Sequence, residues 1–388
     1  MSLLTVGLCF NLRVDSPPDG PDGGPEDAQA EYDSWSTVSA LAEALSFDGA
    51  CRVLPLPFGP DLPELLRWQR PDVVFNIAEG AGGRSRESLA PALFELLRIP
   101  YTGSDPVALG MAMDKSLARW AAAAAGLPVA WGAVAASPQE VEQVVQQAPL
   151  PAFVKPVAEG SSKGVRQRSR VESRDDLREQ ALWVLREYRQ PALVEEYLPG
   201  REFSVGVLGN GEALAVLPVL EVRPGGQDGA FVYCYHTKSG NREQFLCPAP
   251  VDEELGARLA AGACRVFAAL GLRDVARVDF RLSAGGLPCF LEVNPLPGLS
   301  AASLLTAQAR AAGMSLNDLV AAILQAACRR WVAQPDLGQA LKARLARLEG
   351  LLRELHPPAA PGPGGDGYGF ETAALHGQPH TMAGSLPA

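Results

Sequence analysis

Apolar runs of strand length alternate with amphipathic stretches over the first hundred residues. Residues 3–9, 51–56 and 72–77 are compact and mostly apolar, whereas residues 31–45 and 61–69 have the spacing of helices. This order of strand, helix, strand, helix and strand predicts a parallel sheet with helices on its faces. The apolar stripe predicted for the first helix comprises Trp35, Val38, Leu41 and Leu45.

Helical spacing continues at residues 87–97 and 114–125, and the pattern changes near Pro151. From there, β-type runs are joined by turns that contain glycine, which is typical of antiparallel sheets. The predicted strands are 152–155, 165–168, 192–196, 202–208, 213–222 and 231–235, with a tight hairpin turn at 209–211. Helices are predicted again at 253–270, 304–312, 316–331 and 337–355. The expected fold class is α/β, with an α+β C-terminal half.

The composition narrows the classes of function. The chain has 388 residues and a net charge of −10, and no dense block of lysine and arginine, so nucleic acid is not expected as a partner. Its seven cysteines include no CxxC pair, which argues against a zinc site and a disulfide framework. Residues 1–10 lack the basic leader of a signal peptide, and the apolar window 120–136 is broken by Gly126 and Pro128. We therefore expect no membrane span and a cytoplasmic location.

Two alternating runs in the C-terminal half predict a β-hairpin. Residues 277–282 and 290–294 flank a turn at 283–286 that contains two glycines. If Leu282 pairs with Leu287 across this turn, the register of the whole hairpin follows from that pair. Each strand then presents alternate side chains to the two faces.

In that register Arg277 faces Glu292. The side chains that share one face are Asp279, Glu292 and Asn294. Two carboxylates and an amide oxygen beside an arginine form an oxygen-only site, which suits Mg²⁺ bound together with substrate phosphates. The alternative is a surface hairpin whose charged side chains face water.

A polar loop between two β-type runs is a candidate anion site. Lys155 lies at the end of the first run, and the loop after it contains Glu159, Ser161 and Ser162 between small residues. Backbone N–H groups and hydroxyls of such a loop can turn inward around a phosphate. The loop is not a Walker A motif, because it lacks that spacing and no helix is predicted after it. An ordinary turn is the alternative.

An apolar strand that ends in two glutamates and an aromatic residue is a candidate adenine site. Its residues Glu195, Glu196, Tyr197 and Leu198 offer backbone and carboxylate acceptors beside an apolar wall. Glu202, seven residues after Glu195, could reach ribose hydroxyls. The alternative is an edge strand with solvated acids.

These pieces occur in a definite order along the chain. The order is an aspartate followed by Lys115, Lys155 with its Gly-Ser-Ser loop, the segment 195–202, Lys238, and Arg-x-Asp…Glu-x-Asn-Pro-x-Pro-Gly at 277–298. Together they resemble the ATP-grasp fold with an N-terminal Rossmann-like domain, in the branch of the D-alanine–D-alanine ligases and related amino-acid ligases. The resemblance covers roughly residues 74–320 and, more weakly, the N-terminal part.

The resemblance implies a nucleotide site and a metal site. The implied ATP-binding residues are Lys115, Lys155, Glu159, Ser161, Ser162, Glu195, Glu196, Tyr197, Leu198, Glu202 and Lys238. Among them, residues 195–198 would bind adenine, Glu202 the ribose and Lys238 the γ-phosphate. The implied ligands of two Mg²⁺ ions, which Mn²⁺ could replace, are Asp279, Glu292 and Asn294.

The resemblance also implies residues that act on the amino acids. The implied catalytic residues are Glu31, Ser161, Arg277, Gly298 and Ser303. Arg277 and the N–H of Gly298 would stabilise the oxyanion of acyl transfer. Ser303 and Leu304 would bind the carboxylate of the amine-donating substrate. Glu31, with Asp33 in reserve, would meet the first amino group.

The match is weaker on the side of the amino-acid substrate. The family's His-Gly after the third strand is Glu79–Gly80 here, and the following loop, 82–87, is longer and more basic. The family's tyrosine after the γ-phosphate lysine is Ser239. Glu79, expected to contact the substrate, would favour a donor with an extra cationic group, unless Arg84 or Arg86 pairs with it. The sign of this preference stays open.

We therefore expect an ATP-dependent ligase that joins small amino acids through an acyl phosphate. The first candidate activity is D-alanyl-D-alanine synthesis for the cell wall. A ligase for another amino acid or small carboxylate, and a nucleotide-binding module without catalysis, are the alternatives. The expected domains are 1–107 (Rossmann-like), 108–193 (central), 194–332 (C-terminal, with the metal site) and 333–388 (amphipathic helix and disordered tail). Small amino acids are the expected partners, and a homodimer is compatible with the sequence.

The tail 357–388 is rich in proline and glycine and has too few apolar residues to form a core. Deleting it should leave the melting temperature and ATP turnover unchanged within error. Thermal unfolding and a coupled ADP-release assay on the full-length and shortened chains measure both. A large loss of either would show that the tail contributes to the fold or to the site.

Overall fold

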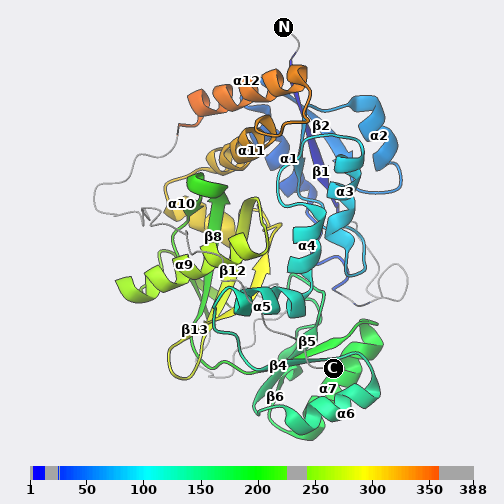
Figure 1. Ribbon diagram of the computed structural model, residues 1–388, viewed down its shortest axis with the longest axis vertical. Helices are drawn as coiled ribbons and strands as arrows, with labels where there is room; N and C mark the ends of the chain where they lie inside the picture. Colours follow the sequence, from blue (N-terminus) through cyan, green and yellow to red (C-terminus); the bar gives the residue numbers. More distant parts are fainter. Residues whose placement is uncertain (1–2, 14–24, 26, 225–242, 358–388) are drawn as a thin grey trace, which may run out of the picture. The chain divides into compact units, whose positions relative to one another are not determined.

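The structure, a computed structural model, describes residues 3–13, 25, 27–224 and 243–357. Its contacts separate Met1–Pro358 from Ala359–Ala388, and the architecture below concerns the first of these units. The described strands form three sheets, each built from strands that are consecutive in sequence (Figure 1).

The N-terminal sheet is parallel, as the sequence predicted. The elements of this part are β1 (Leu4–Phe10), α1 (Trp35–Ser46), β2 (Cys51–Pro57), α2 (Leu62–Gln69), β3 (Val73–Asn76), the 3-10 turn η1 (Arg86–Ser88) and α3 (Leu89–Leu96). β1 lies in the middle and pairs with β2 on one side and β3 on the other. The carboxyl ends of these parallel strands, which include Asn76, therefore meet at one edge.

Helix α1 begins four residues later than predicted. Ser34 is extended, and its hydroxyl accepts the N–H of Thr37 at 3.2 Å, so it caps the helix at Trp35. Trp35 is 63% exposed and does not belong to the buried stripe. The predicted stripe residues that are buried are Val38, Leu41 and Leu45. Because the cap is at Ser34, Glu31 lies in the turn before the helix rather than in its first turn.

The second sheet is antiparallel, with strand order β4-β7-β5-β6. The elements from here to its last strand are α4 (Pro106–Met113), α5 (Lys115–Ala124), β4 (Gly132–Ala135), α6 (Pro138–Gln147), β5 (Ala152–Pro156), η2 (Gln167–Ser169), β6 (Arg170–Val171), α7 (Arg174–Glu187) and β7 (Ala192–Glu196). The predicted strand at 165–168 is wrong, because a loop and η2 occupy those positions. Helices α4, α6 and α7 were not predicted. Asp105, Ser137 and Ser173 cap them by accepting N–H groups of their first turns.

The third sheet has the order β11-β10-β8-β12-β13, with β9 paired to β8. Its elements and the helices around it are β8 (Glu202–Gly209), η3 (Gly211–Ala213), β9 (Ala215–Val216), β10 (Leu220–Pro224), β11 (Glu243–Leu246), α9 (Glu253–Ala269), β12 (Asp274–Leu282), β13 (Pro288–Asn294), α10 (Leu304–Ala311) and α11 (Leu316–Val332). The predicted strand 213–222 is divided into β9 and β10 around Pro218, which has no N–H to donate. The β8–β9 connection contains η3 and is longer than the predicted tight turn. The strand predicted at 231–235 lies outside the described residues.

The hairpin of β12 and β13 has a different register from the predicted one. Leu282 pairs with Pro288 instead of Leu287, and a β-bulge after Asp279 shifts the register by one further residue. The resulting pairs are Arg277 with Asn294 and Asp279 with Glu292. The two shifts together amount to two residues, so Asp279, Glu292 and Asn294 keep the face that the sequence predicted.

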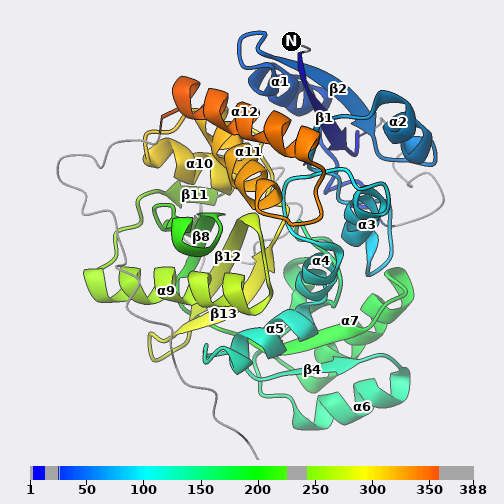
Figure 2. The same ribbon diagram turned by 45° about the horizontal axis from the view of Figure 1, so that its top comes forward.

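The last helix, α12 (Gln339–Leu355), packs on the N-terminal part of the chain (Figures 1 and 2). Its Leu345, Leu348 and Leu352 share one hydrophobic core with β1, α1 and α11. At the edge of this core, Arg344 Nη2 donates to Asp72 Oδ2 at 2.6 Å and to the carbonyl of Leu3. The predicted amphipathic helix thus packs against α11 and joins the core beside the N-terminal sheet.

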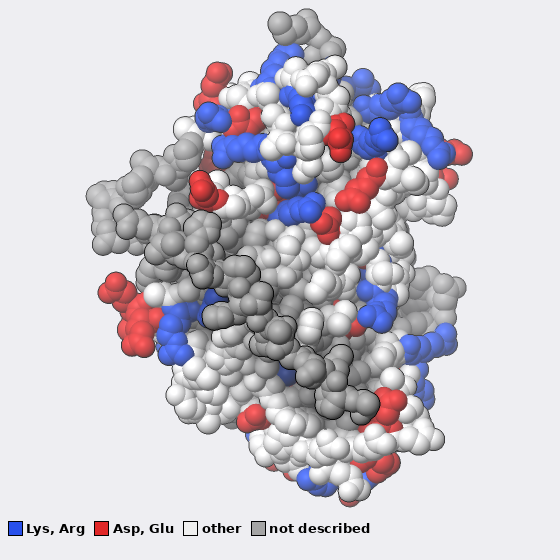
Figure 3. Space-filling model, viewed as in Figure 1, with Lys and Arg blue, Asp and Glu red and all other residues white. Residues whose placement is uncertain are grey.

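The described surface carries mixed charge. On the face shown in Figure 3, lysine and arginine side chains are interspersed with aspartate and glutamate. Among the described helices none is by itself long and apolar enough to cross a membrane. The pair Leu304–Ala311 and Leu316–Val332, bent by 101° at its break, passes that criterion when taken together.

Replacing Leu348 by alanine should destabilise the fold by about 2–5 kcal/mol, because the side chain is fully buried and its loss leaves a cavity. Leu355→Ala at the end of the same helix is the matched control, since Leu355 is 44% exposed and should cost little. Urea denaturation of both variants measures the difference. Equal stability of the two would contradict the docking of α12.

Candidate active site

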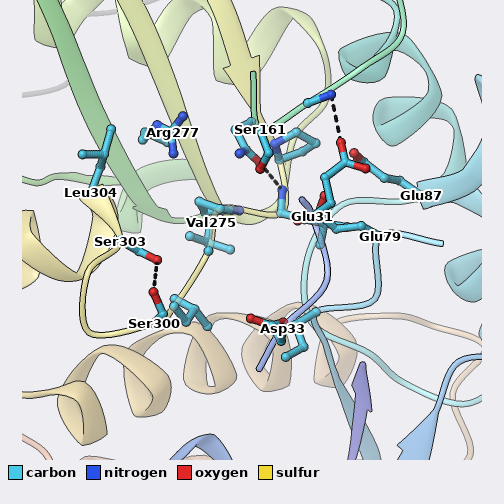
Figure 4. A pocket seen from close by; sticks show the side chains of 18 of the residues that line it. Glu31, Asp33, Glu79, Glu87, Ser161, Val275, Arg277, Ser300, Ser303 and Leu304 are labelled. Carbon is cyan, nitrogen blue, oxygen red and sulfur yellow. Dashed lines mark hydrogen bonds between the residues drawn. The ribbon is translucent and has the colours of Figure 1, made fainter. Parts of the chain in front are cut away.

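A cavity of about 470 Å³ lies where the sheets and their connecting loops meet. Segments far apart in sequence line it: the turn before α1, the end of β3, the loop after β5, and strands β8, β12 and β13 with the loop before α10. Figure 4 shows Glu31, Glu79 and Glu87 on one side of this cavity and Arg277, Ser303 and Leu304 on the other. The cavity therefore has an acidic end and an end formed by the hairpin and α10.

The hairpin places the predicted metal ligands on the wall of the cavity. Asp279 and Glu292 are cross-strand partners, and Asn294 follows on the same face. The Asp279 carboxylate accepts from Arg277 Nη2 at 2.8 Å and from the hydroxyl of Ser204. Glu292 Oε2 lies 3.5 Å from the Nζ of Lys115. Each acid thus has a cation beside it.

The donor set fits a hard divalent cation. Two carboxylates and an amide supply oxygen atoms alone, and each carboxylate has room for more than one partner. In the part of the chain that the structure describes, no group of three or more His, Cys, Asp and Glu forms a richer site. The candidate oxygen ligands are Asp279, Glu292 and the side chain of Asn294, whose Oδ1 accepts the N–H of Leu296 at 3.1 Å.

A second cavity of about 90 Å³ adjoins the first, and Lys115, Glu159, Ser162, Glu202 and Glu292 line both. The residues predicted for the nucleotide that line it are Lys115, Lys155, Glu159, Ser162, Glu195, Glu196, Tyr197, Leu198 and Glu202. The sequence pattern thus selected side chains that the fold brings together. Lys238 lies outside the described residues.

The carboxylate of Glu195 has other partners than the adenine amine for which the sequence predicted it. Its side chain is 5% exposed and forms ion pairs with Arg119 and, at 2.6 Å, with the Nζ of Lys155. The carboxylate is therefore used to hold two cations. Glu196 is exposed, while Tyr197 accepts a hydrogen bond from Arg281 at 3.0 Å and Leu198 is buried. The apolar wall beside the second cavity is formed by Leu198 and Phe290.

Glu202 stands between the two cavities. Its Oε2 lies 3.2 Å from the Nη1 of Arg281. Burial raises the pKa of Glu202 to about 7; Arg281 opposes this shift, and Asp279 and Glu292 add to it. A third carboxylate thus faces the two predicted metal ligands.

The loop after β5 is held by acidic side chains of the N-terminal part. The N–H of Gly160 donates to Glu31 Oε1, and the N–H of Gly164 donates to Asp27 Oδ2, both at 2.8 Å. A Cβ at position 160 would lie 2.6 Å from Glu31 Oε1, so glycine permits this approach. Ser161 and Ser162, whose φ angles are 49° and 61°, line the cavity. Two successive serines in the left-handed region are a strained arrangement that the surrounding contacts maintain.

Glu31 is buried and already has cationic partners. Its carboxylate accepts from Arg86 Nη2 at 2.6 Å and from Lys163 Nζ at 3.1 Å. Burial alone would raise its pKa, but Lys163 and Arg86 bring the pKa of Glu31 below its ordinary value. The predicted partner of an amino group is thus an ionised acid within a network. The reserve candidate Asp33 also lines the cavity, and burial raises its pKa to about 6.

Glu79 and Glu87 line the same end of the cavity, and Glu87 was not among the predicted site residues. Glu87 is 5% exposed, and its Oε2 has no hydrogen-bond partner among the described residues. Burial raises the pKa of Glu87 to about 8, and it raises the pKa of Glu79 well above its ordinary value. The sequence signal that could have identified Glu87 as a site residue was its position next to Arg86 at the end of the basic loop 82–87. Only the fold, however, shows that the pair turns inward.

The remaining predicted residues lie at the opposite end. Ser303 precedes α10, and its Oγ lies 2.8 Å from that of Ser300. Leu304 is the first residue of the helix and is buried, while Gly298 lies in the loop between β13 and α10. All three line the cavity. A helix N-terminus with unpaired N–H groups favours an anion there.

Comparisons with known proteins agree on one family. A family model for the D-Ala D-Ala ligase C-terminus matches residues 123–325. The D-alanine–D-alanine ligase of Aquifex aeolicus (strain VF5) is 35% identical over 292 residues, which are 75% of this chain and 94% of that protein. The D-alanine–D-alanine ligase of Bordetella pertussis (strain Tohama I) is 39% identical over 238 residues, 61% of this chain and 72% of that one.

A solved structure resembles most of this chain in its fold. The D-alanine–D-alanine ligase from Bacillus anthracis, crystallised in complex with ATP, superimposes with a TM-score of 0.65 and covers 84% of this chain and 98% of that one. Its sequence identity is 21%, so the likeness establishes the fold, which is the ATP-grasp fold with a parallel N-terminal sheet.

Replacing Glu202 by glutamine should stabilise the protein at alkaline pH. A carboxyl whose pKa is about 7 when folded and near 4.5 when unfolded makes the protein less stable as pH rises between these values. The substituted glutamine cannot ionise, so the stability advantage of the Glu202→Gln variant should grow by roughly 1–2 kcal/mol from pH 5 to pH 8, after allowance for solvent screening. Urea unfolding at several pH values measures this, with the exposed Glu212→Gln as control. A pH-independent difference would contradict the raised pKa.

Proposed function

The chain belongs to the D-alanine–D-alanine ligase family and is an ATP-dependent ligase, and from this premise we propose that it joins the carboxylate of one small amino acid to the amine of another. D-alanyl-D-alanine synthesis, a cell-wall precursor step, is the activity proposed first. The observation that carries the proposal is the placement of Lys115, which lines both cavities beside Glu292. Lys115 therefore lies at the junction where a phosphoryl group would pass from a nucleotide to a carboxylate.

ATP is the proposed phosphoryl donor. We place its adenine against Leu198 in the second cavity, with its phosphates near Lys115, Lys155 and the loop after β5. Lys155 is held at 2.6 Å by Glu195, which fixes the position of its ammonium group. Lys238 is proposed for the γ-phosphate on the resemblance alone.

We propose that Asp279, Glu292 and Asn294 hold Mg²⁺. When bound, the ions would neutralise phosphate charge and polarise the transferred group. The chain's own contribution is the rigid presentation of three oxygen ligands on paired strands. Arg277, which now donates to Asp279, lies beside the position of the carboxylate to be activated.

Acyl transfer needs donors for an oxyanion and a fixed amine. We propose that Arg277 and the N–H of Gly298 stabilise the oxyanion that forms when the amine attacks. The carboxylate of the amine-donating amino acid would be held by Ser303 and the first N–H of α10 at Leu304. Ser161, on the loop that faces this space, would help to enclose the reacting groups and exclude water.

The domain boundaries at 107, 193 and 332 remain proposals, as do a cytoplasmic location and small amino acids as the only partners. Two of the sheets fit the division, since β1–β3 precede residue 107 and β8–β13 follow residue 193. The second sheet extends past the boundary at 193, because its strand β7 is Ala192–Glu196. Helix α12, although it lies beyond residue 332, contributes to the core of the N-terminal part.

A second candidate is a ligase whose acyl donor is not D-alanine. The observation that favours it is the acidic end of the cavity. There, Glu79 and Glu87 provide more carboxyl groups than a single α-ammonium group needs as partners. The nucleotide and metal sites are the same in both candidates, so they differ only in the donor amino acid.

Glu292→Gln should lower amino-acid-dependent ADP release by at least about two orders of magnitude, because one charge of the Mg²⁺ site is lost while its shape remains. Its melting temperature should change little, since the side chain is 34% exposed and its contact with Lys115 is 3.5 Å long. The test is a coupled ADP-release assay with D-alanine and other amino acids. Full turnover by the variant would refute the metal assignment, and no ADP release by the wild type with any amino acid would refute the proposed function.

A further inference from the structure

Glu79 and Glu87 are two acidic side chains of the cavity to which the reaction proposed first, D-alanyl-D-alanine synthesis, assigns no role. Both line its acidic end, beside Glu31 (Figure 4). Glu87 is only 5% exposed, and its Oε2 is unpartnered among the described residues. A buried acceptor without a partner is costly to the free energy of folding. The unpartnered oxygen of Glu87 therefore indicates that a bound ligand supplies the missing hydrogen-bond donor.

The neighbouring arginines do not neutralise Glu79. Arg86 turns to Glu31, at 2.6 Å, and lies 3.3 Å from the carboxylate of Glu159. Arg84 is largely exposed and pairs with Asp114 at 2.9 Å. Neither arginine therefore forms an ion pair with Glu79, although the charge of Arg86 lowers the pKa of Glu79 against the larger effect of burial.

The other acids around the cavity each have a cation. The pairs are Asp279 with Arg277, Glu292 with Lys115, Glu202 with Arg281, and Asp33 with Arg13 as its nearest cation. At the acidic end, the ion pairs of Arg86 and Lys163 go to Glu31 and Glu159. Among the described residues no ion pair joins Glu79 or Glu87 to a cation, and burial raises the pKa of both, so that their charged forms are disfavoured without a ligand. A ligand that brought two positive charges would pair with both carboxyl groups and favour their ionised forms.

We propose, on the basis of the ligase function above, that the acyl donor is an amino acid with a second basic group, of the class of ornithine and lysine. Its carboxylate faces the hairpin, and its two ammonium groups face Glu79 and Glu87 at the opposite end. The single positive charge of D-alanine satisfies one of these acids and leaves the other buried without a partner. Glu79 and Glu87 are thus the residues that determine donor specificity.

The physical basis of this selectivity is the cost of an unmatched group. A pocket that is built to pair with a charged or hydrogen-bonding substituent rejects an analogue that lacks it far more strongly than an apolar pocket rejects a missing methylene. Norleucine has nearly the shape of lysine without the terminal ammonium group. It would leave Glu87 without its partner, so discrimination of at least about tenfold is expected.

The experiment compares donors by kcat/KM for ADP release at fixed D-alanine as the amine donor. The donors are D- and L-lysine, D- and L-ornithine, D- and L-norleucine and D-alanine, and tandem mass spectrometry of the dipeptide shows which amino acid supplied the carboxylate. We expect the better diamino acid to exceed norleucine at least about tenfold, mainly through KM. Norleucine or D-alanine as an equal or better donor would overturn the proposal.

Glu87→Gln and Glu79→Gln test the residues. Each should reduce the ratio of kcat/KM for the diamino acid to that for norleucine at least about tenfold. The matched control is Glu64→Gln, a residue of α2 that does not line the cavity, which should keep the wild-type ratio. Since removal of an unmatched buried charge costs the fold little, melting temperatures should be maintained. An unchanged ratio in both folded variants would overturn the assignment of Glu79 and Glu87. If one variant fails to fold, the ratio of the other variant, compared with that of the wild type, tests the assignment.

A pH profile separates charge recognition from a structural role. The charged groups that face Glu87 are Glu31, Glu79, Arg86, Lys115 and Lys163. With the pKa of Glu87 raised to about 8, more of its carboxylate is ionised as pH rises. The ratio of diamino acid to norleucine should therefore rise at least about threefold from roughly pH 6.5 to pH 8, and a flat profile would contradict recognition by Glu87.

The two proposals fail in different ways. ADP release that depends on neutral amino acids, without preference for a second cation, would overturn the donor assignment and leave the ligase function intact. No amino-acid-dependent ADP release with any donor would overturn the ligase function itself.

Discussion

The buried ion pairs of Glu31 with Arg86 and Lys163 connect three segments that are far apart in the sequence. Glu31 precedes α1, Arg86 lies in η1, and Lys163 belongs to the loop after β5. The N–H of Gly164 in the same loop donates to the carboxylate of Asp27. Buried charges are costly unless they are paired and hydrogen-bonded, so the loss of one member exposes the others to the full desolvation penalty, typically about 3–5 kcal/mol. This network therefore fixes the wall of the cavity.

The same network sets the electrostatic character of the site. Because the ion pairs of Arg86 and Lys163 go to Glu31 and Glu159, the two acids beside them, Glu79 and Glu87, form no ion pair with either cation. At the other end, Arg277 and Lys115 accompany the carboxylates of the hairpin. The acids are consequently paired at the end proposed for phosphates and metal, whereas Glu79 and Glu87 have no ion pair at the end proposed for the donor amino acid. Under that proposal, a constraint of folding also affects the choice of substrate.

The hairpin illustrates which sequence predictions are robust. The predicted register was wrong by two residues in its outer part, yet Asp279, Glu292 and Asn294 share the predicted face. Side chains repeat every two residues along a strand, so an error of two preserves the face, whereas an error of one would have reversed it. The bulge after Asp279 leaves no trace in the apolar pattern, and only the pairing reveals it.

The sequence alone determined the order of most strands and helices and the parallel N-terminal sheet, and it selected the residues proposed for the nucleotide and metal sites, most of which line the two cavities. These features depend on local periodicity, on turn residues and on motif spacing, which are properties of short segments. The helices α6 and α7 were missed although buried apolar residues recur at helical spacing in both. These residues are Val141, Val144 and Val145 in α6 and Leu177, Ala181 and Val184 in α7. Those stripes and the serine caps were the missed signals. Only the tertiary structure decided that Glu195 binds Arg119 and Lys155, that Arg86 pairs with Glu31, and that α12 joins the core beside the N-terminal sheet. In each case the partners are far apart in sequence, and which of several nearby charges a side chain pairs with depends on the distances and burial that folding creates.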